Sequence, residues 1–340
     1  MSIQIEEHIS LKPYNTFGLN AKARYFTRLT AEEQLPELIQ TEVFKSNKVL
    51  WLGGGSNMLL TQDFNGLVVK LDLKGINIQP AEEGFAIITS YAGENWHDFV
   101  QYCIAQNLGG LENLSLIPGN VGTTPVQNIG AYGVEIKDHF YQLKAFDVET
   151  NRFVSFNAKA CNFGYRDSVF KHEGKGRFIV TQVSFKLTTT NHKLNTSYGA
   201  ITAEMEKQGL PLTIEGVSKA VIAIRQSKLP HPKEIGNSGS FFKNPVVSAE
   251  KADALKQEFP ELVSYEVGYG QVKLAAGWLI EQSGMKGYRN GDAGVHTRQA
   301  LVLVNYGEAQ GQDLVKMAEL VQQKVYNKFG VNLEAEVNII

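Results

Sequence analysis

The sequence predicts an α+β protein with roughly two domains. The chain has 340 residues, about twice the length of an average domain. Its first half contains several short apolar segments of the kind that form strands, whereas helical periodicity is more prominent in its second half. Hydrophobic residues make up 43% of the chain and charged residues 20%, a composition typical of a globular protein with a full core.

In the first half, short apolar or alternating segments predict strands at residues 48–52, 67–71, 85–92, 143–148, 152–156 and 178–187. One helix is expected among them, at residues 95–107. Its apolar residues recur three and four positions apart and therefore share one face. Asn95 is of a type that caps a helix start, and two glycines follow the expected end.

A polar stretch at residues 188–198 is the best candidate for a domain boundary. Beyond it, helices are predicted at residues 217–228, 249–259, 273–283 and 313–329, and strands at 301–304 and 333–339. Ser248 is placed to cap the second of these helices, and Gly330 follows the last one.

Charge and cysteine content exclude several classes of protein. The net charge of −2 is too small to favour nucleic acid or an anionic membrane as the main partner. No signal peptide is visible at the N-terminus, and no apolar stretch approaches the ~20 residues needed to span a bilayer. The two cysteines and seven histidines form no metal-ligand or disulfide pattern. We therefore expect a cytoplasmic protein without a metal.

The segment 118–133 is rich in glycine, contains two prolines and carries no charged side chain. Glycine and proline both disfavour the interior of helices and strands, so this segment is expected to approach a ligand with its backbone. A second glycine-rich segment, 53–57, follows a predicted strand. Alone it is as well explained by a tight turn, but together the two segments favour a pyrophosphate site. Neither matches a dinucleotide-binding or ATP-binding glycine motif.

Three further segments have unusual polar residues. Residues 236–245, GNSGSFFKNP, come near to a hydrolase nucleophile motif without matching it. Residues 163–168, FGYRDS, place Arg166 beside Tyr165, which is either a surface packing pair or an anion clamp. Glu334 and Glu336 alternate along the last predicted strand, where solvent-facing charges are the default interpretation.

Taken together, these motifs resemble the UDP-N-acetylenolpyruvoylglucosamine reductase family, in its longer, tyrosine-containing subtype, over essentially the whole chain. The resemblance rests on NTFG at 15–18, GGGSN at 53–57, the run from 110 to 135, FGYRDSVFK at 163–171, KLPHP at 228–232, GSFFKNP at 239–245, KLAAGWLIEQ at 273–282 and LEAEV at 333–337. GSFFKNP and QNIGAYG are the most specific of these motifs.

The resemblance implies an FAD-binding domain of the vanillyl-alcohol-oxidase type, made of two α+β subdomains, plus a smaller α+β substrate-binding domain. We expect the FAD-binding domain at residues 1–205, divided near 70–75, the substrate-binding domain at 206–330, and a C-terminal strand at 331–340 that returns to the active site. FAD would be bound non-covalently, and NADPH would be the co-substrate.

The family's binding residues can be placed on this sequence. The residues expected to contact FAD are Gly53, Gly54, Gly55, Ser56, Asn57, Pro118, Gly119, Gly122, Thr123, Asn128, Gly130, Ala131, Tyr132 and Gly133. Those expected to contact the nucleotide sugar are Tyr165, Tyr198, Lys228, Asn244 and Gln299. Tyr198 corresponds to the tyrosine that folds over the substrate diphosphate in the longer subtype.

The implied reaction reduces UDP-N-acetylglucosamine enolpyruvate to UDP-N-acetylmuramate, a peptidoglycan precursor. FAD takes hydride from NADPH and passes it to the vinyl carbon, and Ser240 then protonates the enolate. Arg166 and Glu336 polarise the substrate carboxyl group, which stabilises the developing charge. Glu336 can do so only if it is protonated or shares a proton.

Two departures from the family pattern bear on these assignments. Ala335 stands where the family often has proline, and Glu336 is near the terminus, where fraying would weaken its assignment. Ser238 offers a second serine, but only Ser240 matches the SFFKNP register.

Two other functions stay open at this point. One is an FAD-dependent sugar or hydroxyacid oxidase, which would be reoxidised rapidly by O₂. The other is a non-catalytic nucleotide-sugar binding protein, in which replacement of Ser240 would change no activity. For the reductase we expect a monomer whose partners are the nucleotide sugar and NADPH.

Overall fold

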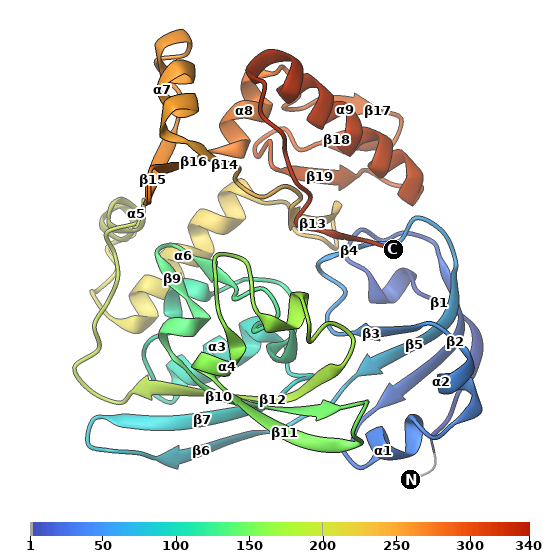
Figure 1. Cartoon of the computed structure of the whole chain (residues 1–340). Coiled ribbons are helices and arrows are strands. Elements are labelled where there is room, and N and C mark those ends of the chain that lie inside the picture. Colours follow the sequence, from blue (N-terminus) through green and yellow to red (C-terminus); the bar gives the residue numbers. More distant parts are fainter. Residues whose placement is uncertain (1–2, 199) are drawn as a thin grey trace. The chain divides into compact units, whose positions relative to one another are not determined.

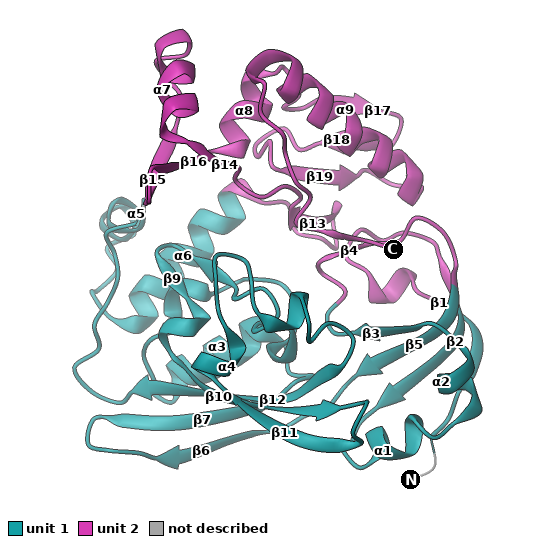
Figure 2. Ribbon diagram, viewed as in Figure 1, with its two compact units in different colours: residues 1–9, 23–54, 65–227 teal, residues 10–22, 55–64, 228–340 magenta. Residues whose placement is uncertain are grey.

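The computed structural model describes residues 3–198 and 200–340. Figure 1 shows its helices and strands, and the chain divides into two compact units (Figure 2). Unit 1 consists of residues 1–9, 23–54 and 65–227, and unit 2 consists of residues 10–22, 55–64 and 228–340. Both units mix helices and strands, as expected for an α+β protein.

An antiparallel five-stranded sheet forms the larger core of unit 1. Its order is β11 (Arg152–Asn157), β10 (Phe140–Asp147), β12 (Phe178–Thr188), β7 (Phe85–Tyr91) and β6 (Ile76–Pro80). Helix α3 (Trp96–Ala105) contributes Trp96, Phe99, Val100 and Cys103 to the core of this sheet. Asn95 caps the helix by accepting a hydrogen bond from the Asp98 N–H. The long glycine-rich segment is attached to this core, because the Gly119 carbonyl accepts a hydrogen bond from the Trp96 N–H at 3.0 Å.

A second sheet, of unit 1 except for the terminal strand residues Ser10, Lys22 and Phe64, has the order β1 (Glu6–Ser10), β2 (Lys22–Leu29), β5 (Phe64–Leu71) and β3 (Val49–Leu52). Strands β3 and β5 are parallel, so the segment 53–57 leaves the sheet at the carboxyl end of β3. The helices of unit 1 besides α3 are α1 (Gln34–Leu38), α2 (Glu42–Ser46), α4 (Ala158–Cys161), α5 (Ile201–Gln208) and α6 (Ile214–Lys228), whose last residue belongs to unit 2.

In unit 2, the main sheet has the order β13 (Gly236–Ser240), β19 (Val302–Asn305), β18 (Ala293–Val295) and β17 (Arg289–Asn290). Helix α9 (Gly311–Phe329) packs on β18 and β19 and also contacts α8 (Ala276–Gln282). The apolar face of α9 is buried, and Gly330 ends the helix in the left-handed conformation. Both features agree with the helix predicted at 313–329.

Two smaller sheets complete unit 2. The first is β14 (Val246–Ser248), β16 (Gln271–Leu274) and β15 (Ser264–Gly268), with α7 (Ala249–Glu258) against β14 and β16. Ser248 caps α7, as predicted. The second pairs β20 (Asn338–Ile339) in parallel with β4 (Met58–Leu59). The remaining two-stranded sheet, in unit 1, is β8 (Gly130–Ala131) with β9 (Val134–Glu135).

Two predicted elements need correction. The helix expected at 273–283 starts only at Ala276, because Lys273 lies in β16, paired with Val246 on one side and Tyr265 on the other. The strand expected at 333–339 is reduced to an isolated bridge at Ala335 and the short β20. The remaining strands and helices of the prediction are present with shifted ends.

The two units do not follow the expected domain limits at 205/206 and 330/331, which stay predictions. Residues 10–22 join unit 2 because Thr16 accepts a hydrogen bond from the Asn237 N–H. The Phe17 carbonyl likewise accepts one from the Asn305 side chain. Such long-range contacts leave no signal in the sequence.

Candidate active site

The two glycine-rich segments meet in unit 1, to which Gly53 and Gly54 belong. A side chain on Gly54 would place its Cβ 2.7 Å from the Gly119 Cα and 2.9 Å from Asn120 Oδ1. Glycine is therefore required at position 54 for the close approach of the two backbones. The two segments therefore lie side by side here, and their joint role in binding a pyrophosphate stays a prediction. Gly55, Ser56 and Asn57 belong to unit 2.

The backbone N–H groups of the two segments differ in their availability. Those of Val121, Gly122 and Thr123 donate to carbonyl groups within unit 1. In contrast, the N–H groups of Gly53 and Gly54 donate to no residue in 3–198 or 200–340. An anion at this place would consequently be held by the 53–54 backbone, and contacts from Gly122 and Thr123 stay predictions.

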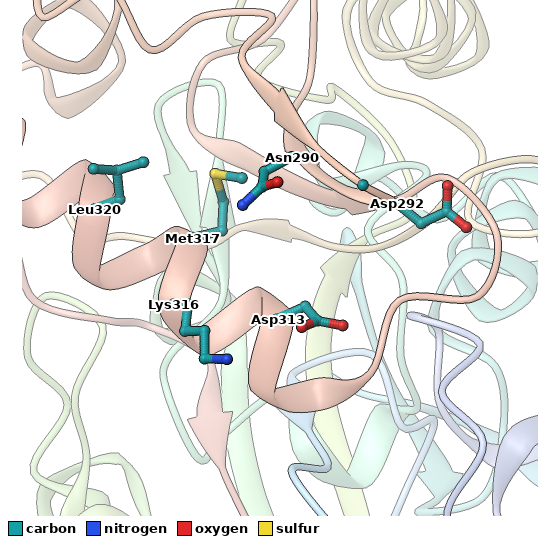
Figure 3. A pocket seen from close by; sticks show the side chains of 7 residues that line it. Asn290, Asp292, Asp313, Lys316, Met317 and Leu320 are labelled. Carbon is teal, nitrogen blue, oxygen red and sulfur yellow. The ribbon is translucent and has the colours of Figure 1, made fainter.

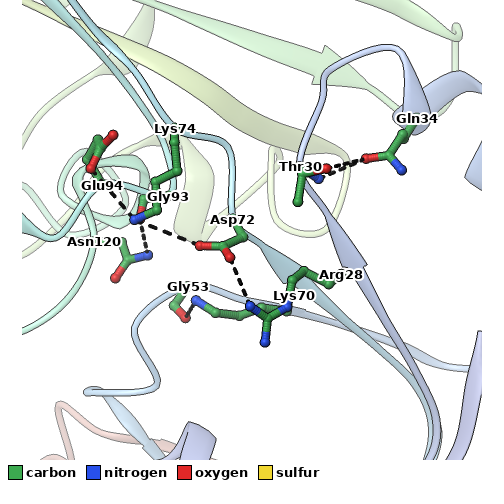
Figure 4. A network of polar contacts seen from close by, with 10 residues as sticks. All are labelled: Arg28, Thr30, Gln34, Gly53, Lys70, Asp72, Lys74, Gly93, Glu94 and Asn120. Carbon is green, nitrogen blue, oxygen red and sulfur yellow. Dashed lines mark hydrogen bonds and ion pairs between the residues drawn. The ribbon is translucent and has the colours of Figure 1, made fainter. Parts of the chain in front are cut away.

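A lysine that the sequence reasoning missed lies beside this loop. Lys70 Nζ donates to the Gly53 carbonyl at 2.7 Å (Figure 4). Burial lowers the pKa of Lys70 below its ordinary value, while Asp72 acts in the opposite direction. The only sequence signal is a lysine within the otherwise apolar LVVKL strand. Lys70 thus holds the loop by the Gly53 carbonyl, and the N–H groups of Gly53 and Gly54 stay available to a ligand.

The same network fixes the neighbouring segments. Lys74 Nζ donates to the Gly93 carbonyl and pairs with Asp72 and Glu94, as Figure 4 shows. The Asn120 side chain donates to the same Gly93 carbonyl at 3.0 Å. The start of the long glycine-rich segment is thereby connected to the ends of the sheet strands.

Asn128 organises the second part of the glycine-rich segment. It is fully buried, and its Nδ2 donates to the Gly164 carbonyl at 2.9 Å and to Glu135 at 3.0 Å. Its Oδ1 accepts from the Lys137 N–H at 3.2 Å. These bonds engage both polar atoms of the side chain, so its expected contact with a cofactor stays a prediction.

Arg166 lies at the third position of a tight turn between Gly164 and Asp167. Its φ of +52° places the backbone in the left-handed region, which residues other than glycine, asparagine, aspartate and histidine seldom adopt. The guanidinium donates from Nη2 to the Gly130 carbonyl at 2.6 Å and from Nη1 to the Asn128 carbonyl at 3.5 Å. The expected catalytic arginine is therefore bonded to the glycine-rich segment within unit 1.

The region contains a second arginine that the sequence reasoning missed. Arg225 of α6 bonds the Tyr132 hydroxyl and donates from Nε to the Leu116 carbonyl at 3.3 Å. Burial lowers the pKa of Arg225 below its ordinary value. No carboxylate pairs with this guanidinium among residues 3–198 and 200–340. The positive charge of Arg225 is thus available to an anion. The only indication in the sequence is an arginine within a predicted helix that is otherwise largely apolar.

Ser240 is the last residue of β13 in unit 2. The pairing of β13 with β19 is irregular between Asn237 and Ser240, where Gly239 has a φ of +69°. This bulge changes the direction in which the following side chain points. Ser240 is exposed, and its hydroxyl has no hydrogen-bond partner among the described residues. Ser238 is buried instead, with its hydroxyl 3.3 Å from Thr16 Oγ1.

Glu336 is held beside this serine by the backbone. Its N–H donates to the Phe241 carbonyl at 2.8 Å, and its carbonyl accepts from Asn57 Nδ2 at 3.3 Å. Beyond it, the Ile340 N–H donates to Leu59. The expected strand is mostly absent, yet the tail is anchored on both sides of Glu336. Glu334, two residues earlier, is exposed and pairs with Lys243.

The residues expected to contact the nucleotide sugar fall into both units. In unit 2, Asn244 Oδ1 accepts from the Ala276 N–H at 3.0 Å. Gln299 Oε1 lies 3.4 Å from where a Cβ on Gly277 would stand. These two side chains therefore lie at the same end of α8. Lys228 is exposed in unit 2, and Tyr165 and Tyr198 are exposed in unit 1.

A cavity of about 220 Å³ in unit 2 contains none of these residues (Figure 3). Its lining is Asn290, Gly291, Asp292, Asp313, Lys316, Met317 and Leu320. Asp292 accepts from Arg289 and from the Glu308 N–H, and Asp313 accepts from the Gln310 N–H. Both carboxylates therefore serve the fold, and the cavity offers no reason to move the candidate site. No cluster of His, Cys, Asp or Glu that could hold a metal occurs within the part of the chain that the structure describes.

Two family models match the chain. Residues 231–340 match the C-terminal domain of UDP-N-acetylenolpyruvoylglucosamine reductase, and residues 23–155 match an FAD binding domain. The reductase of Flavobacterium johnsoniae is 55% identical over 99% of this chain and 100% of the relative. That of Chromobacterium violaceum is 52% identical over 100% of both.

A solved structure shows the same fold. The crystal structure of the reductase from Thermus caldophilus covers 99% of both chains with a TM-score of 0.69 and 24% identity. With the FAD-binding model, this confirms the expected α+β fold, in which an FAD-binding domain precedes a smaller C-terminal domain. The C-terminal model begins at residue 231, close to residue 228, where the last segment of unit 2 begins.

Proposed function

The chain belongs to the UDP-N-acetylenolpyruvoylglucosamine reductase family, and we propose that Ser240, Arg166 and Glu336 carry out its chemistry. It is an FAD-dependent oxidoreductase that reduces the enolpyruvyl group of UDP-N-acetylglucosamine enolpyruvate in peptidoglycan precursor synthesis, with NADPH as co-substrate.

The Gly53–Gly54 loop fits the pyrophosphate of FAD. A pyrophosphate needs N–H donors and positive charge, and backbone N–H groups that lack internal partners are suited to it. Gly53 and Gly54 offer such groups, and the Lys70 ammonium lies on the carbonyl of the first. Bound FAD supplies the hydride chemistry, while the protein supplies binding and orientation.

Ser240 is proposed as the proton donor. Reduction of a carbon–carbon double bond adds a hydride to one carbon and a proton to the other. In this assignment the Ser240 O–H bond breaks, its proton goes to the carbon next to the carboxyl group, and the serine oxygen regains a proton from solvent. A general acid must be placed within hydrogen-bond reach of the reacting atom. The exposed Ser240 hydroxyl, which has no hydrogen-bond partner among the described residues, supports this role, whereas the Ser238 hydroxyl is buried beside Thr16.

Arg166 and Glu336 are proposed to stabilise charge on the substrate carboxyl group. As the hydride adds, negative charge moves toward that group, and a guanidinium donor and a protonated carboxyl donor both stabilise it. The guanidinium of Arg166 is already oriented by the Gly130 carbonyl, and the backbone of Glu336 is fixed on both sides. Fixed donors need little reorganisation during the reaction.

The observation that supports the proposal most strongly is the contrast between the exposed Ser240 and the buried Ser238. The experiment that tests the overall function is a visible absorption spectrum of the purified protein. We expect a yellow protein whose flavin bands are bleached by NADPH and restored by the enolpyruvyl sugar under anaerobic conditions. A colourless protein that takes up no FAD would contradict the proposal.

We further propose that the enzyme acts as a cytoplasmic monomer without a nucleic-acid partner. The near-neutral net charge of −2 supports the last point. Within the described residues, no helix has both the length and the apolar character required to cross a membrane. Light scattering coupled to gel filtration tests the monomer: a mass near 37.6 kDa supports it, and a multiple of that mass contradicts it.

A further inference from the structure

The turn that carries Arg166 is held in a conformation that its own sequence disfavours. A left-handed arginine persists only where the surroundings hold it in place, and such strain concentrates at functional sites. The Asn128 side chain fixes the first residue of the turn, through the Gly164 carbonyl. The Arg166 carbonyl itself accepts from Lys171 Nζ at 2.9 Å. Lys171 therefore contacts the backbone of the strained residue directly.

Lys171 is anchored independently of the turn. It ends the short 3₁₀ helix Val169–Lys171, which Ser168 caps by accepting from the Phe170 N–H. The Ser168 hydroxyl also donates to the Val126 carbonyl at 2.6 Å, and the Phe170 ring packs edge-on against Phe156. The lysine thus projects from a fixed element, and it contributes a charge-assisted hydrogen bond, which is stronger than a neutral one.

From this geometry we propose that Lys171 is a positioning residue for the reductase reaction. Its ammonium holds the Arg166 backbone so that the guanidinium is directed correctly during reduction of the enolpyruvyl group. The inference rests on the function proposed above for Arg166. A positioning role differs from a general structural role in its effect on the two half-reactions. Loss of Lys171 should slow only reoxidation by the enolpyruvyl sugar, the half-reaction that uses Arg166.

The test compares Lys171→Met with Lys171→Arg, which retains a cationic donor, and with Lys175→Met as a matched control. Lys175 is exposed, and its side chain forms no hydrogen bond or ion pair within the described residues. Stopped-flow absorbance measures the two half-reactions separately: reduction of FAD by NADPH, and reoxidation of reduced FAD by the enolpyruvyl sugar. Thermal unfolding and FAD content are measured on each variant.

We expect Lys171→Met to slow reoxidation by the sugar about tenfold or more, because small misplacement of a catalytic group is costly. FAD reduction, FAD content and the KM for the sugar should stay within about threefold of the parent, and Lys171→Arg should recover most of the rate. If Lys171→Met matches Lys175→Met in reoxidation, or slows both half-reactions equally, the inference is overturned.

A companion variant, Arg166→Met, separates this inference from the proposed function. If Arg166→Met slows reoxidation and Lys171→Met does not, the role of Lys171 fails while that of Arg166 stands. If Arg166→Met also leaves reoxidation unchanged, the proposed role of Arg166 fails, and the inference about Lys171 fails with it.

Discussion

Arg166 donates from Nη2 to the carbonyl oxygen of Gly130 at 2.6 Å. This bond connects the side chain expected to act on the substrate to the segment expected to lie against the flavin. The two residues are 36 positions apart in the chain, and the left-handed turn at Arg166 brings them together. The consequence is that the position of the arginine and the conformation of the glycine-rich segment depend on each other.

Replacement of Arg166 by methionine should therefore have two effects of different size. We expect the rate of substrate reduction to fall by roughly 10² or more, as for loss of a donor aimed at developing charge. FAD affinity should weaken by only about three- to tenfold, because the hydrogen bonds of Arg166 to the Gly130 and Asn128 carbonyls are lost. Stopped-flow reoxidation measures the rate of substrate reduction, and titration of the apoprotein with FAD measures the affinity for FAD. Unchanged FAD affinity would show that the Gly130 bond does not shape the glycine-rich segment.

Lys70→Met should weaken FAD binding without a direct effect on the chemistry. The substitution removes a hydrogen bond to the Gly53 carbonyl and a positive charge beside the loop, so we expect an approximately tenfold higher Kd for FAD. At saturating FAD, both half-reactions should proceed at near-parental rates. Lys48→Met, at an exposed lysine just before β3, is the matched control. Equal Kd values for the two variants would rule out the role of Lys70.

Shortening the chain by residues 338–340 should impair substrate reduction. The cut removes β20 and the Ile340 bond to Leu59, which anchor the tail beyond Glu336. We expect reoxidation by the enolpyruvyl sugar to slow about tenfold or more, while NADPH still reduces the flavin at the parental rate. Glu336→Gln in the full-length chain provides the comparison. A shortened enzyme with normal reoxidation would show that Glu336 needs no anchored tail.

The decrease in the free energy of unfolding between pH 5 and pH 2 should depend on Asp147. Two hydrogen bonds from Arg177 lower its pKa from 3.8 to about 2. A carboxylate with a lowered folded-state pKa stabilises the fold above its unfolded pKa, and this stabilisation disappears as the pH falls through the folded value. Asp147→Asn should thus lower the urea midpoint at pH 5 and make progressively less difference toward pH 2.

The control for this measurement is Asp253→Asn, at an exposed position of α7. It should leave the urea midpoint nearly unchanged at every pH, since exposed charges contribute little. A gap between Asp147→Asn and the parent that stayed constant from pH 5 to pH 2 would be inconsistent with the ion pair.

Local signals in the sequence were sufficient to predict part of the fold. The Asn95 cap and apolar face predicted α3, and the apolar face with Gly330 predicted α9. Elements that depend on distant partners were not predictable in this way. Lys273 looks helical in sequence but pairs with Val246 and Tyr265, and no local pattern reveals that residues 10–22 and 55–64 join unit 2.

The candidate site shows the same division. Ser240, Arg166 and Glu336 were assigned from motif resemblance, which names residues without showing what holds them. Lys70 and Arg225 bond to groups that are distant in the sequence, the Gly53 carbonyl and the Tyr132 hydroxyl. Lys171 bonds to the nearby Arg166 carbonyl, which only the folded turn brings within reach. Such contacts depend on the tertiary structure. In the sequence they are indicated only by a lysine or arginine among apolar residues.

The most direct test of Ser240 as the proton donor compares Ser240→Ala with Ser238→Ala by stopped-flow absorbance under anaerobic conditions. For Ser240→Ala, we expect FAD reduction by NADPH at the parental rate and reoxidation by the enolpyruvyl sugar slowed by about 10² or more, the usual contribution of a general acid. Ser238→Ala should stay within about threefold in both half-reactions, since its hydroxyl contributes one ordinary hydrogen bond to Thr16. Normal reoxidation in Ser240→Ala, or a larger loss in Ser238→Ala, would contradict the assignment of the proton donor.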